Sequence, residues 1–353
     1  MSVTVVIPNY NHGKLIARAV LALMAQVPAP AEIIIVNDAS TDDSLTVIAR
    51  LQAKFSCIRL INHEHNKGVV AGMNEGLHAA NHALVYFAAA DDYTMPGFFA
   101  AAKRAFERYP GAAFFCGRVV LVDPDGKILG FRPFMQPAAH SVMLTPAMVR
   151  AKLKTSDNWS VGPSVVYARG RLIDNGGFDE NMGAFTDGHM VRLLALQSGF
   201  YFDTAVVAAW ERYPESYSAK TALSTKDNVR LIGSAVAAVK ASFPPDIRDA
   251  YADWLGRRLR FNMARLWLVF DEGRVDSKGL ADVLQFKGAA RSVLGLCARL
   301  PFPRLAVLSW MALVLRPYGV GAILAGWYRT KAAAAGDTAS VAAMIADARA
   351  RSM

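Results

Sequence analysis

The sequence predicts an α/β fold in which a mostly parallel sheet is flanked by helices and followed by a helical C-terminal extension. Short, continuous apolar runs alternate with amphipathic segments up to about residue 122, and strands without polar alternation are typical of a parallel sheet covered on both faces. After about Thr225 the chain reads as helical throughout, so we expect one domain over residues 1–225 and a helical region over residues 226–353. The chain has 353 residues, 53% of them hydrophobic, which is enough to supply a core for both parts.

The expected elements follow from these runs in chain order. Strands are expected at Val3–Ile7, Glu32–Val36, Ile58–Asn62, Leu84–Phe87, Ala113–Val122 and Lys127–Phe131. Helices are expected at Leu15–Gln26, Asp42–Phe55, Val69–Ala80, Met95–Tyr109, Ala147–Leu153 and Met190–Ser198. Between about residues 133 and 217 the pattern is less regular and rich in Gly, Pro, Trp and polar residues, which is typical of loops that build a substrate pocket.

Two of the expected strands end in loops that carry aspartate. The strand at Glu32–Val36 leads to Asp38, and the strand at Leu84–Phe87 leads to Asp91 and Asp92. In an open α/β sheet, ligands bind beyond the carboxyl ends of strands, where such loops meet. One loop would hold a ribose or base and the other a divalent cation. The pair therefore predicts a site for a sugar nucleotide.

Composition narrows the choice of partners and of compartment. The net charge is +10, and residues 251–353 contain 15 Lys and Arg against 7 Asp and Glu. Such an excess suits an anionic lipid surface or nucleic acid. No zinc-finger, RNA-binding or helix-turn-helix signature accompanies it, so nucleic acid is not expected as a partner. Three dispersed cysteines and the lack of a signal-peptide pattern at the N-terminus indicate the cytoplasm.

The C-terminal region contains a strongly apolar stretch over residues 305–328. Arg316 and Pro317 divide it into two runs, each shorter than the roughly 20 residues that a spanning helix needs. Trp310, Trp327 and Tyr328 suit a headgroup boundary. The pattern therefore fits either a helical hairpin packed on the catalytic domain or a peripheral contact with the inner face of the cell membrane, and fits a true span less well.

Five segments of the chain, taken in order, resemble one protein family. They are Val5–Asn11, Val36–Asp42, Asn66–Gly76, Ala90–Asp92 and Gly176–Glu180. Each segment is a weak signal, but in this order and spacing they resemble glycosyltransferase family 2, from Val3 to about Ser218. The resemblance implies the GT-A fold and an inverting transfer of a sugar from a nucleotide-diphosphate sugar.

The resemblance also implies a donor site. Asp38 and the Pro8–Tyr10 loop would hold the nucleoside, while Lys67 and Arg212 would contact the diphosphate. A carboxylate can accept hydrogen bonds from a uracil N–H or a ribose hydroxyl, and a UDP-sugar is the expected donor. The alternatives are a helix-capping role for Asp38, simple packing for Tyr10 and a surface charge for Lys67.

A Mg²⁺ or Mn²⁺ site at Asp91 and Asp92 is implied as well, with Asp91 also touching the donor. Hard cations choose oxygen ligands, and they stabilise the charge that develops on a leaving diphosphate. Ala89 and Tyr213 stand where the family often carries an aspartate and a histidine, so the expected metal shell is thinned. A solvated turn is the alternative for the aspartate pair.

Asp187 is the expected catalytic base. The family carries a glutamate–aspartate pair here, and in this chain Thr186 replaces the glutamate. A carboxylate in this position would remove the proton from the attacking acceptor hydroxyl. The alternative is a cap for the helix at Met190–Ser198. Trp159 and His189 are the candidates for contacting the acceptor, with plain packing and a structural hydrogen bond as their alternatives.

Taken together, these residues favour a metal-dependent, inverting transferase that acts on a hydroxyl of a glycan or lipid-linked acceptor. The other interpretation is a degenerate, non-catalytic protein that binds a nucleotide or glycan and serves as an assembly partner. A nucleotide-binding dehydrogenase and a phosphate-binding-loop protein are excluded, because the glycine-rich turn of the first and the Gly-Lys-Ser/Thr loop of the second are absent.

Overall fold

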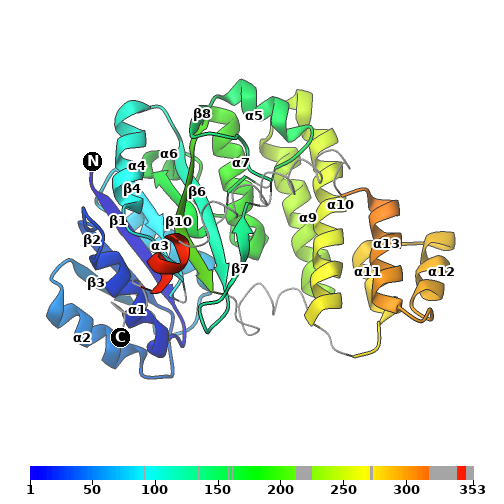
Figure 1. Ribbon diagram of the computed structural model, residues 1–353, viewed down its shortest axis with the longest axis horizontal. Coiled ribbons are helices and arrows are strands. Elements are labelled where there is room, and N and C mark those ends of the chain that lie inside the picture. Colours follow the sequence, from blue (N-terminus) through cyan, green and yellow to red (C-terminus); the bar gives the residue numbers. More distant parts are fainter. Residues whose placement is uncertain are drawn as a thin grey trace.

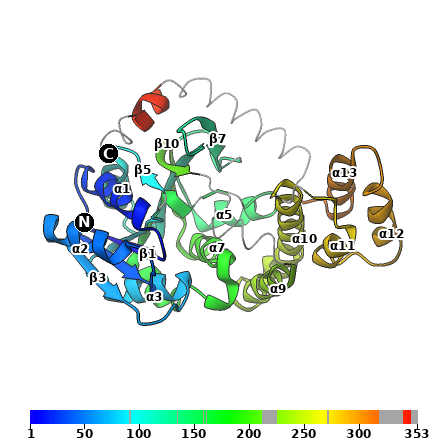
Figure 2. The same ribbon diagram turned by 90° about the horizontal axis from the view of Figure 1, so that it is seen from below.

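The computed structural model describes residues 1–90, 92–133, 135–157, 159–160, 162–211, 225–270, 273–317 and 340–346. A sheet with helices on both faces forms the larger part, and the helices from α9 onward lie to one side of it (Figure 1). Figure 2 shows α11, α12 and α13 as a separate group beyond α9 and α10, on the side away from the sheet.

The strands within the described residues form one mixed sheet of ten. They are β1 (Val3–Asn9), β2 (Glu32–Asn37), β3 (Ile58–Asn62), β4 (Leu84–Phe87), β5 (Tyr93–Thr94), β6 (Phe114–Val122), β7 (Ile128–Arg132), β8 (Val142–Leu144), β9 (Val165–Ala168) and β10 (Phe200–Glu211). Their order is β3-β2-β1-β4-β9-β6-β10-β5, with β7 paired to β6 and β8 paired to β10. The carboxyl ends of β1, β2 and β4 meet at one edge, because these three strands are parallel.

The described helices lie on both faces of the sheet and in the C-terminal region. They are α1 (Gly13–Met24), α2 (Ser44–Lys54), α3 (Val69–Ala79), α4 (Phe98–Arg108), α5 (Pro146–Leu153), α6 (Arg169–Asp174), α7 (Thr186–Ser198), α9 (Thr225–Ser242), α10 (Pro245–Phe270), α11 (Ser277–Leu284), α12 (Gly288–Cys297) and α13 (Pro303–Leu315). Two short 3₁₀ helices, η1 (Gly162–Ser164) and η2 (Glu180–Phe185), complete the described elements.

The apolar runs in β1 and β2 have a direct structural cause, which is burial on both faces of the sheet. Alternate side chains of a strand point to opposite faces. One set packs with α1, α2 and α4, and the other with α3: Val5, Ile7, Ile33 and Ile35 in the first, Val6, Ile34 and Val36 in the second. Helix α3 approaches so closely that a Cβ added at Gly76 would lie 2.3 Å from a methyl carbon of Val6. A glycine is therefore required at this point of the family-like segment.

The sheet is less parallel than the sequence predicts. Among the described strands, β9 is antiparallel to both β4 and β6, and β5, β7 and β8 also pair in antiparallel fashion. The expected strands and helices are all present with small shifts of their ends. However, β9, β10 and the start of α7 fall in the segment that we expected to be irregular. Strand β10 is long but carries mixed polar and apolar residues, so its pattern does not stand out in the sequence.

The expected domain boundary between residues 225 and 226 does not coincide with a break in the apolar core. Ile232, Val239 and Leu255 of α9 and α10 belong to the same cluster as α3, α7 and the sheet. A second cluster joins the far end of α10, from Phe261 to Leu268, to α11, α12 and α13. The two apolar clusters therefore share α10, and each contains residues from one half of this helix.

The apolar stretch of the C-terminal region is only partly within the described residues. Its first run is helix α13, while residues 318–328, with Trp327 and Tyr328, lie outside them. Within the described part of the chain, no helix is both long and apolar enough to cross a membrane. Farther on, Val341 and Ile345 are buried against β5, β6 and β7, so residues 340–346 return to the sheet.

Candidate active site

A cavity of about 290 Å³ opens at the carboxyl ends of β1 and β4. Its walls come from the end of β1, the loop after β4, the first turn of α3, η1 and the start of α7. The lining residues are Pro8, His12, Val69, Met73, Phe87, Ala88, Ala89, Ala90, Asp92, Gly162, Pro163, Tyr167 and Asp187. Two carboxylates, Asp92 and Asp187, thus face one space although they are far apart in the sequence.

Asp187 lies in the first turn of α7. The residue that caps this helix is Phe185, which makes no side-chain capping bond, so the capping alternative for Asp187 does not apply. The backbone N–H of Gly188 donates a hydrogen bond of 2.6 Å to Asp187 Oδ1. Across the cavity wall, a Cβ added at Gly162 would lie 3.4 Å from Asp187 Oδ2, so this glycine leaves room for the carboxylate.

The electrostatic surroundings of Asp187 favour a stronger base than an ordinary carboxylate. Burial raises the pKa of Asp187, and this effect outweighs the hydrogen bond from Gly188 and the nearby charge of Arg192. A carboxyl with a raised pKa binds a proton more tightly when it receives one. Perturbed carboxylates in a cleft are frequent at functional sites, although structural networks perturb pKa values too.

A buried ionic network holds α7 against α10. Asp157 Oδ2 accepts hydrogen bonds of 2.6 Å from both Tyr251 and Arg258, and it lies 2.7 Å from Arg192 Nε. Arg192 lies on α7, five residues after Asp187, and also donates to the carbonyl of Gly188. Because breaking one member of a buried pair leaves an uncompensated charge, this network fixes the helix that carries Asp187. No sequence pattern predicts this network, because its members are far apart in the chain.

Asp92 contributes the second carboxylate of the cavity. Its Oδ1 accepts a hydrogen bond of 3.2 Å from the backbone N–H of Glu211, at the end of β10. Glu211 is itself paired with Arg18 of α1 at 2.7 Å. These contacts place the loop after β4 in a defined position at the cavity wall. Asp91 lies outside the described residues.

The described oxygen ligands at the cavity are compatible with a divalent cation, but they do not complete the coordination shell of the cation. Asp92 offers a hard oxygen ligand beside the cavity, which is the type that Mg²⁺ and Mn²⁺ prefer. Ala89, at the position of the missing aspartate, lines the same cavity and offers none. No cluster of three metal-binding side chains occurs among the residues that the structure describes.

Asp38 is buried and occupied by the protein's own groups. Its carboxylate accepts hydrogen bonds of 2.7 and 2.8 Å from the backbone N–H groups of Lys67 and Gly68, and it lies 2.7 Å from His63 Nδ1. Burial by itself would raise the pKa of Asp38, but these hydrogen bonds outweigh it and hold the pKa below its usual value. Asp38 does not line the cavity, and its described contacts tie the loop before α3 to the end of β2. The donor role expected for it stays a prediction.

The other expected donor residues lie at different distances from the cavity. Pro8 lines it, whereas Tyr10 is exposed on the following loop. Lys67 is also exposed, with its Nζ 3.5 Å from a carboxylate oxygen of Glu75. Arg212 and Tyr213 lie outside the described residues. Of the members of this group that the structure describes, Pro8 lines the cavity, while Tyr10 and Lys67 do not.

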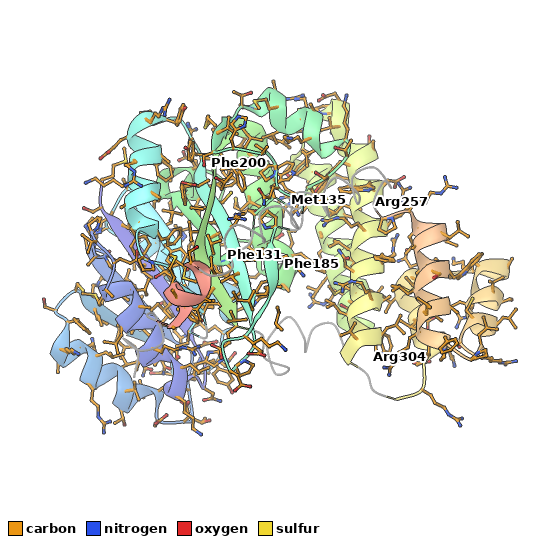
Figure 3. All side chains as sticks on the ribbon, viewed as in Figure 1. Phe131, Met135, Phe185, Phe200, Arg257 and Arg304 are labelled. Atoms are coloured by element: carbon orange, nitrogen blue, oxygen red, sulfur yellow. The ribbon has the colours of Figure 1, made fainter. Side chains whose placement is uncertain are left out.

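The expectation that Trp159 stacks on an acceptor sugar is wrong. The side chain is 2% exposed, and its ring stacks on Phe200 with the centroids 5.7 Å apart. Figure 3 labels Phe200 within the packed region of the sheet. Plain packing, the alternative considered for Trp159, accounts for this ring, because both its faces are covered by the core.

His189 is likewise placed by packing. Its ring stacks on Phe243, which lies between α9 and α10, and burial, with the charge of Arg192, lowers its pKa to about 4. Its Nε2 lies 3.4 Å from Ser242 Oγ, as expected for a structural hydrogen bond. His189 does not line the cavity that holds Asp187 and Asp92.

His12 is a cavity residue that the sequence analysis missed. It precedes α1 and lines the cavity together with Pro8. A single histidine before a glycine forms no recognisable pattern, so only the fold reveals its position.

Two of the family-like segments are joined by hydrogen bonds. Asn74 exchanges two hydrogen bonds of 2.8 Å with the backbone of Phe178.

Comparison with known proteins identifies the family. Residues 4–146 match the family model described as Glycosyl transferase family 2. This segment belongs to glycosyltransferase family 2. The matched segment carries β1, β2, β4 and the loop with Asp92, so it includes most walls of the cavity. Asp187 lies beyond it.

One relative and two solved structures are similar to most of the chain. A protein of Mycobacterium tuberculosis named as uncharacterized protein MT1568 is 27% identical over 263 residues, which are 71% of this chain and 80% of that protein. The structure of Staphylococcus aureus TarS 1-349 in complex with UDP-GlcNAc covers 90% of this chain and 91% of its own, with 17% identity and a TM-score of 0.58. The mannosyltransferase PcManGT from Pyrobaculum calidifontis, in complex with GDP-Man and Mn²⁺, covers 95% of this chain and 86% of its own, with 19% identity and a TM-score of 0.54. The structural similarity to these two proteins establishes the GT-A fold for this chain.

Proposed function

We propose that this chain is an inverting glycosyltransferase that transfers a sugar from a UDP-sugar to a hydroxyl of a glycan or lipid-linked acceptor. The observation that carries the proposal is one cavity at the carboxyl edge of the sheet, with Asp92 on one wall and the half-buried carboxylate of Asp187 on another. Acid–base and cation-binding groups meet there, at the edge where α/β proteins bind ligands.

Asp187 is proposed as the general base. The acceptor hydroxyl attacks the anomeric carbon, and Asp187 takes its proton as the bond to the diphosphate breaks. The raised pKa suits this task, since a general base works best when its pKa approaches the working pH. Arg192 and the Asp157 network act through the position of α7 and do not touch the reacting atoms.

Asp92, with neighbouring Asp91, is proposed to hold Mg²⁺ or Mn²⁺ against the diphosphate. A bound divalent cation would offset the negative charge that develops on the leaving group. The fit rests on the carboxylate of Asp92 at the cavity wall, and the complex of the mannosyltransferase with Mn²⁺ supports it by fold analogy. Ala89 limits the number of ligands, so we expect weaker cation binding than in a site with a further carboxylate.

The proposed donor is a UDP-sugar, and the proposed workplace is the inner face of the cell membrane. The solved TarS complex contains UDP-GlcNAc and the solved mannosyltransferase complex contains GDP-Man, so neighbours of this fold accept either nucleotide. The excess of basic residues in the C-terminal region supports a peripheral site near anionic lipid, where lipid-linked acceptors occur.

Calorimetric titration with UDP, with and without Mn²⁺, tests this proposal. We expect binding that strengthens with Mn²⁺, and we expect the metal dependence to disappear in Asp91→Ala. Asp174→Asn is the matched control, because Asp174 is an exposed carboxylate at the end of α6. Tight binding that ignores the cation would contradict the metal role.

A non-catalytic assembly partner is the second candidate, and Ala89 in the cavity wall is the observation that favours it. This candidate predicts that UDP or a glycan binds while no UDP-sugar is consumed. A screen of UDP-sugars with the wild-type protein separates the two. Turnover of any donor that requires Asp187 would exclude the non-catalytic protein.

A further inference from the structure

The outer face of α13 is apolar although it lies on the surface of the molecule. The positions that point outward are spaced along one helical face, and all are exposed: Phe302, Leu305, Ser309, Ala312, Leu313 and Arg316. Phe302 is 77% exposed, Leu305 65% and Leu313 63%. The opposite face, with Val307, Met311 and Leu315, is buried against α10, α11 and α12. A surface helix of a soluble protein normally turns polar residues outward.

Further exposed leucines lie in the last turn of α12 and in the loop before α13. Leu296 is 61% exposed, and Leu300 is exposed as well. We call Leu296, Leu300, Phe302, Leu305 and Leu313 the outer patch. A groove of about 890 Å³ runs beside it and is lined by Arg274, Arg299 and Arg304 together with Phe302 and Leu305. Figure 3 labels Arg304 in the α11–α13 group, which lies at the end of the molecule away from the sheet. Contiguous apolar surface of this kind marks an interaction site.

The charge around the outer patch is mainly positive, although Asp282 of α11 pairs with Arg291 at 2.9 Å. Residues 287–317 contain five basic residues and no Asp or Glu: Lys287, Arg291, Arg299, Arg304 and Arg316. Exposed leucine and phenylalanine beside arginine is the composition of segments that lie in the headgroup region of a bilayer. Arginine adds attraction to anionic lipid, because the surface potential of such a membrane is negative.

We propose that the outer patch docks the protein on an anionic lipid bilayer, with α13 lying in the headgroup region. The helix has 13 residues, so it is too short to span a bilayer and suits an interfacial position. A second copy of the chain is a poorer occupant, since a two-fold contact would bring like charges together. Nucleic acid is poorer too, because it would leave the leucines without a partner.

Helix α10 links this surface to the catalytic cavity. Its first half carries Tyr251 and Arg258, which bind Asp157 in the network that holds α7. Its second half, with Phe261 and Leu268, is packed in the α11–α13 cluster. A rigid helix therefore connects the docking surface to the helix of Asp187. The inference that docking presents a lipid-linked acceptor rests on the proposed function, whereas the membrane contact itself does not.

Sedimentation of the full-length protein with lipid vesicles tests the docking surface. One set of vesicles is phosphatidylcholine alone, and the other contains phosphatidylglycerol in addition. We expect binding to the second set that weakens as salt is added, because exposed charges are screened. No binding to the anionic vesicles at low salt would overturn the proposal.

Two double variants locate the contact. Phe302→Ser with Leu305→Ser removes apolar area and should lower the partition coefficient by at least about tenfold. Arg299→Gln with Arg304→Gln should lower it by about 25-fold, at about fivefold per arginine. The controls are Leu45→Ser with Leu129→Ser and Arg50→Gln with Arg171→Gln, which remove exposed residues of the same kinds from the sheet domain. Equal losses in controls and test variants would overturn the proposal.

Three further readouts keep the test decisive. Because the outer patch is exposed, the serine variant should keep the melting temperature of the wild type, and a clear fall would show that another part of the chain covers this face. A concentration-dependent dimer that the same variant dissolves would assign the surface to a second copy. UDP binding should persist in every variant. Lost vesicle binding with intact UDP binding separates this surface from the cavity, and the reverse result would overturn only the proposed function.

Discussion

Asp38, which is buried, and Asp187, which is half-buried, have surroundings that shift the pKa of the carboxyl group in opposite directions. Asp38 meets two backbone N–H groups and an imidazole, and its pKa is held below the usual value. Asp187 lines a cavity, and burial raises its pKa. The first carboxylate stabilises the loop that it joins. The second is costly to keep charged in the folded protein, and this cost is what makes it a better base.

The largest expected effect in this comparison is the loss of sugar transfer in Asp187→Asn. We expect kcat/KM to fall by about 10²–10⁴, the usual contribution of a positioned base. The affinity for UDP should stay within about twofold, because the amide has nearly the same size and removes only the base. Transfer assays and UDP calorimetry on the same preparation measure both quantities, with Asp174→Asn as the control. Retained transfer would remove Asp187 from the base role.

The acidic limb of the pH–activity profile gives a related test. Asp187 must be ionised to accept a proton, and its pKa is raised by burial. Activity should therefore fall off on the acid side at a higher pH than the value of about 3.9 for an ordinary aspartate. The slope should be absent from the residual activity of Asp187→Asn. A limb at or below the ordinary value would contradict the raised pKa.

Asp38→Asn should have the largest effect on stability. The amide leaves one buried N–H donor facing another donor, so we expect a loss of about 2–3 kcal/mol in the free energy of unfolding. The pKa of Asp38 is lowered on folding, so its contribution is present above the unfolded value and is lost as pH falls through the folded one. Denaturant unfolding at neutral and acid pH measures this.

Asp123→Asn is the control for that prediction. Asp123 also accepts two backbone N–H bonds, from Asp125 and Lys127, but in an exposed turn. We expect a loss of only about 1 kcal/mol, the usual net contribution of a hydrogen bond that water can replace. Equal losses at the two positions would show that the burial of Asp38 has no bearing on its role.

Asp187→Asn should change stability in the opposite direction. Because the folded pKa of Asp187 is raised, the ionised carboxylate destabilises the native state at neutral pH, and its removal should add about 1 kcal/mol. The sign follows from linkage, since the folded protein binds the proton more tightly than the unfolded chain. The gain should vanish as pH falls below the unfolded value. Thermal unfolding of wild type and variant across this pH range provides the measurement.

The smallest expected effect is a change in stability in Ala39→Gly, next to Asp38. Ala39 follows Asp38 with a φ of +57°, where an L side chain is strained and glycine is not. We expect a gain of about 0.5–1 kcal/mol in stability. Ala49→Gly, on the exposed side of α2, should instead cost about 1 kcal/mol. A gain in stability at Ala39 together with a loss at Ala49, for the same substitution to glycine, would confirm the backbone strain at Ala39.

Much of the first half of the fold was predictable, and the reason is visible in β1 and β2. Both faces of these strands are covered, so Val5 and Val6 alike had to be apolar, and the run stands out in the sequence. The second half was harder. Strand β9 is short and antiparallel, and its identity depends on pairing with β4 and β6 rather than on its own pattern. The sequence predicts the start of α7 at Met190, whereas the helix begins at Thr186. The first turn carries Asp187, Gly188 and His189, which have no apolar periodicity.

By itself the sequence determined the α/β class, the family-like segments and the aspartates that end buried strands. It did so because burial and backbone geometry constrain residue type locally, as at Val6 and Gly76. Only the tertiary structure decided which aspartates meet. It joined Asp187 to Asp92 across a cavity, turned Asp38 toward its own loop and buried Trp159 in the core. Such outcomes depend on contacts between residues distant in the chain, and a one-dimensional pattern carries no record of those contacts.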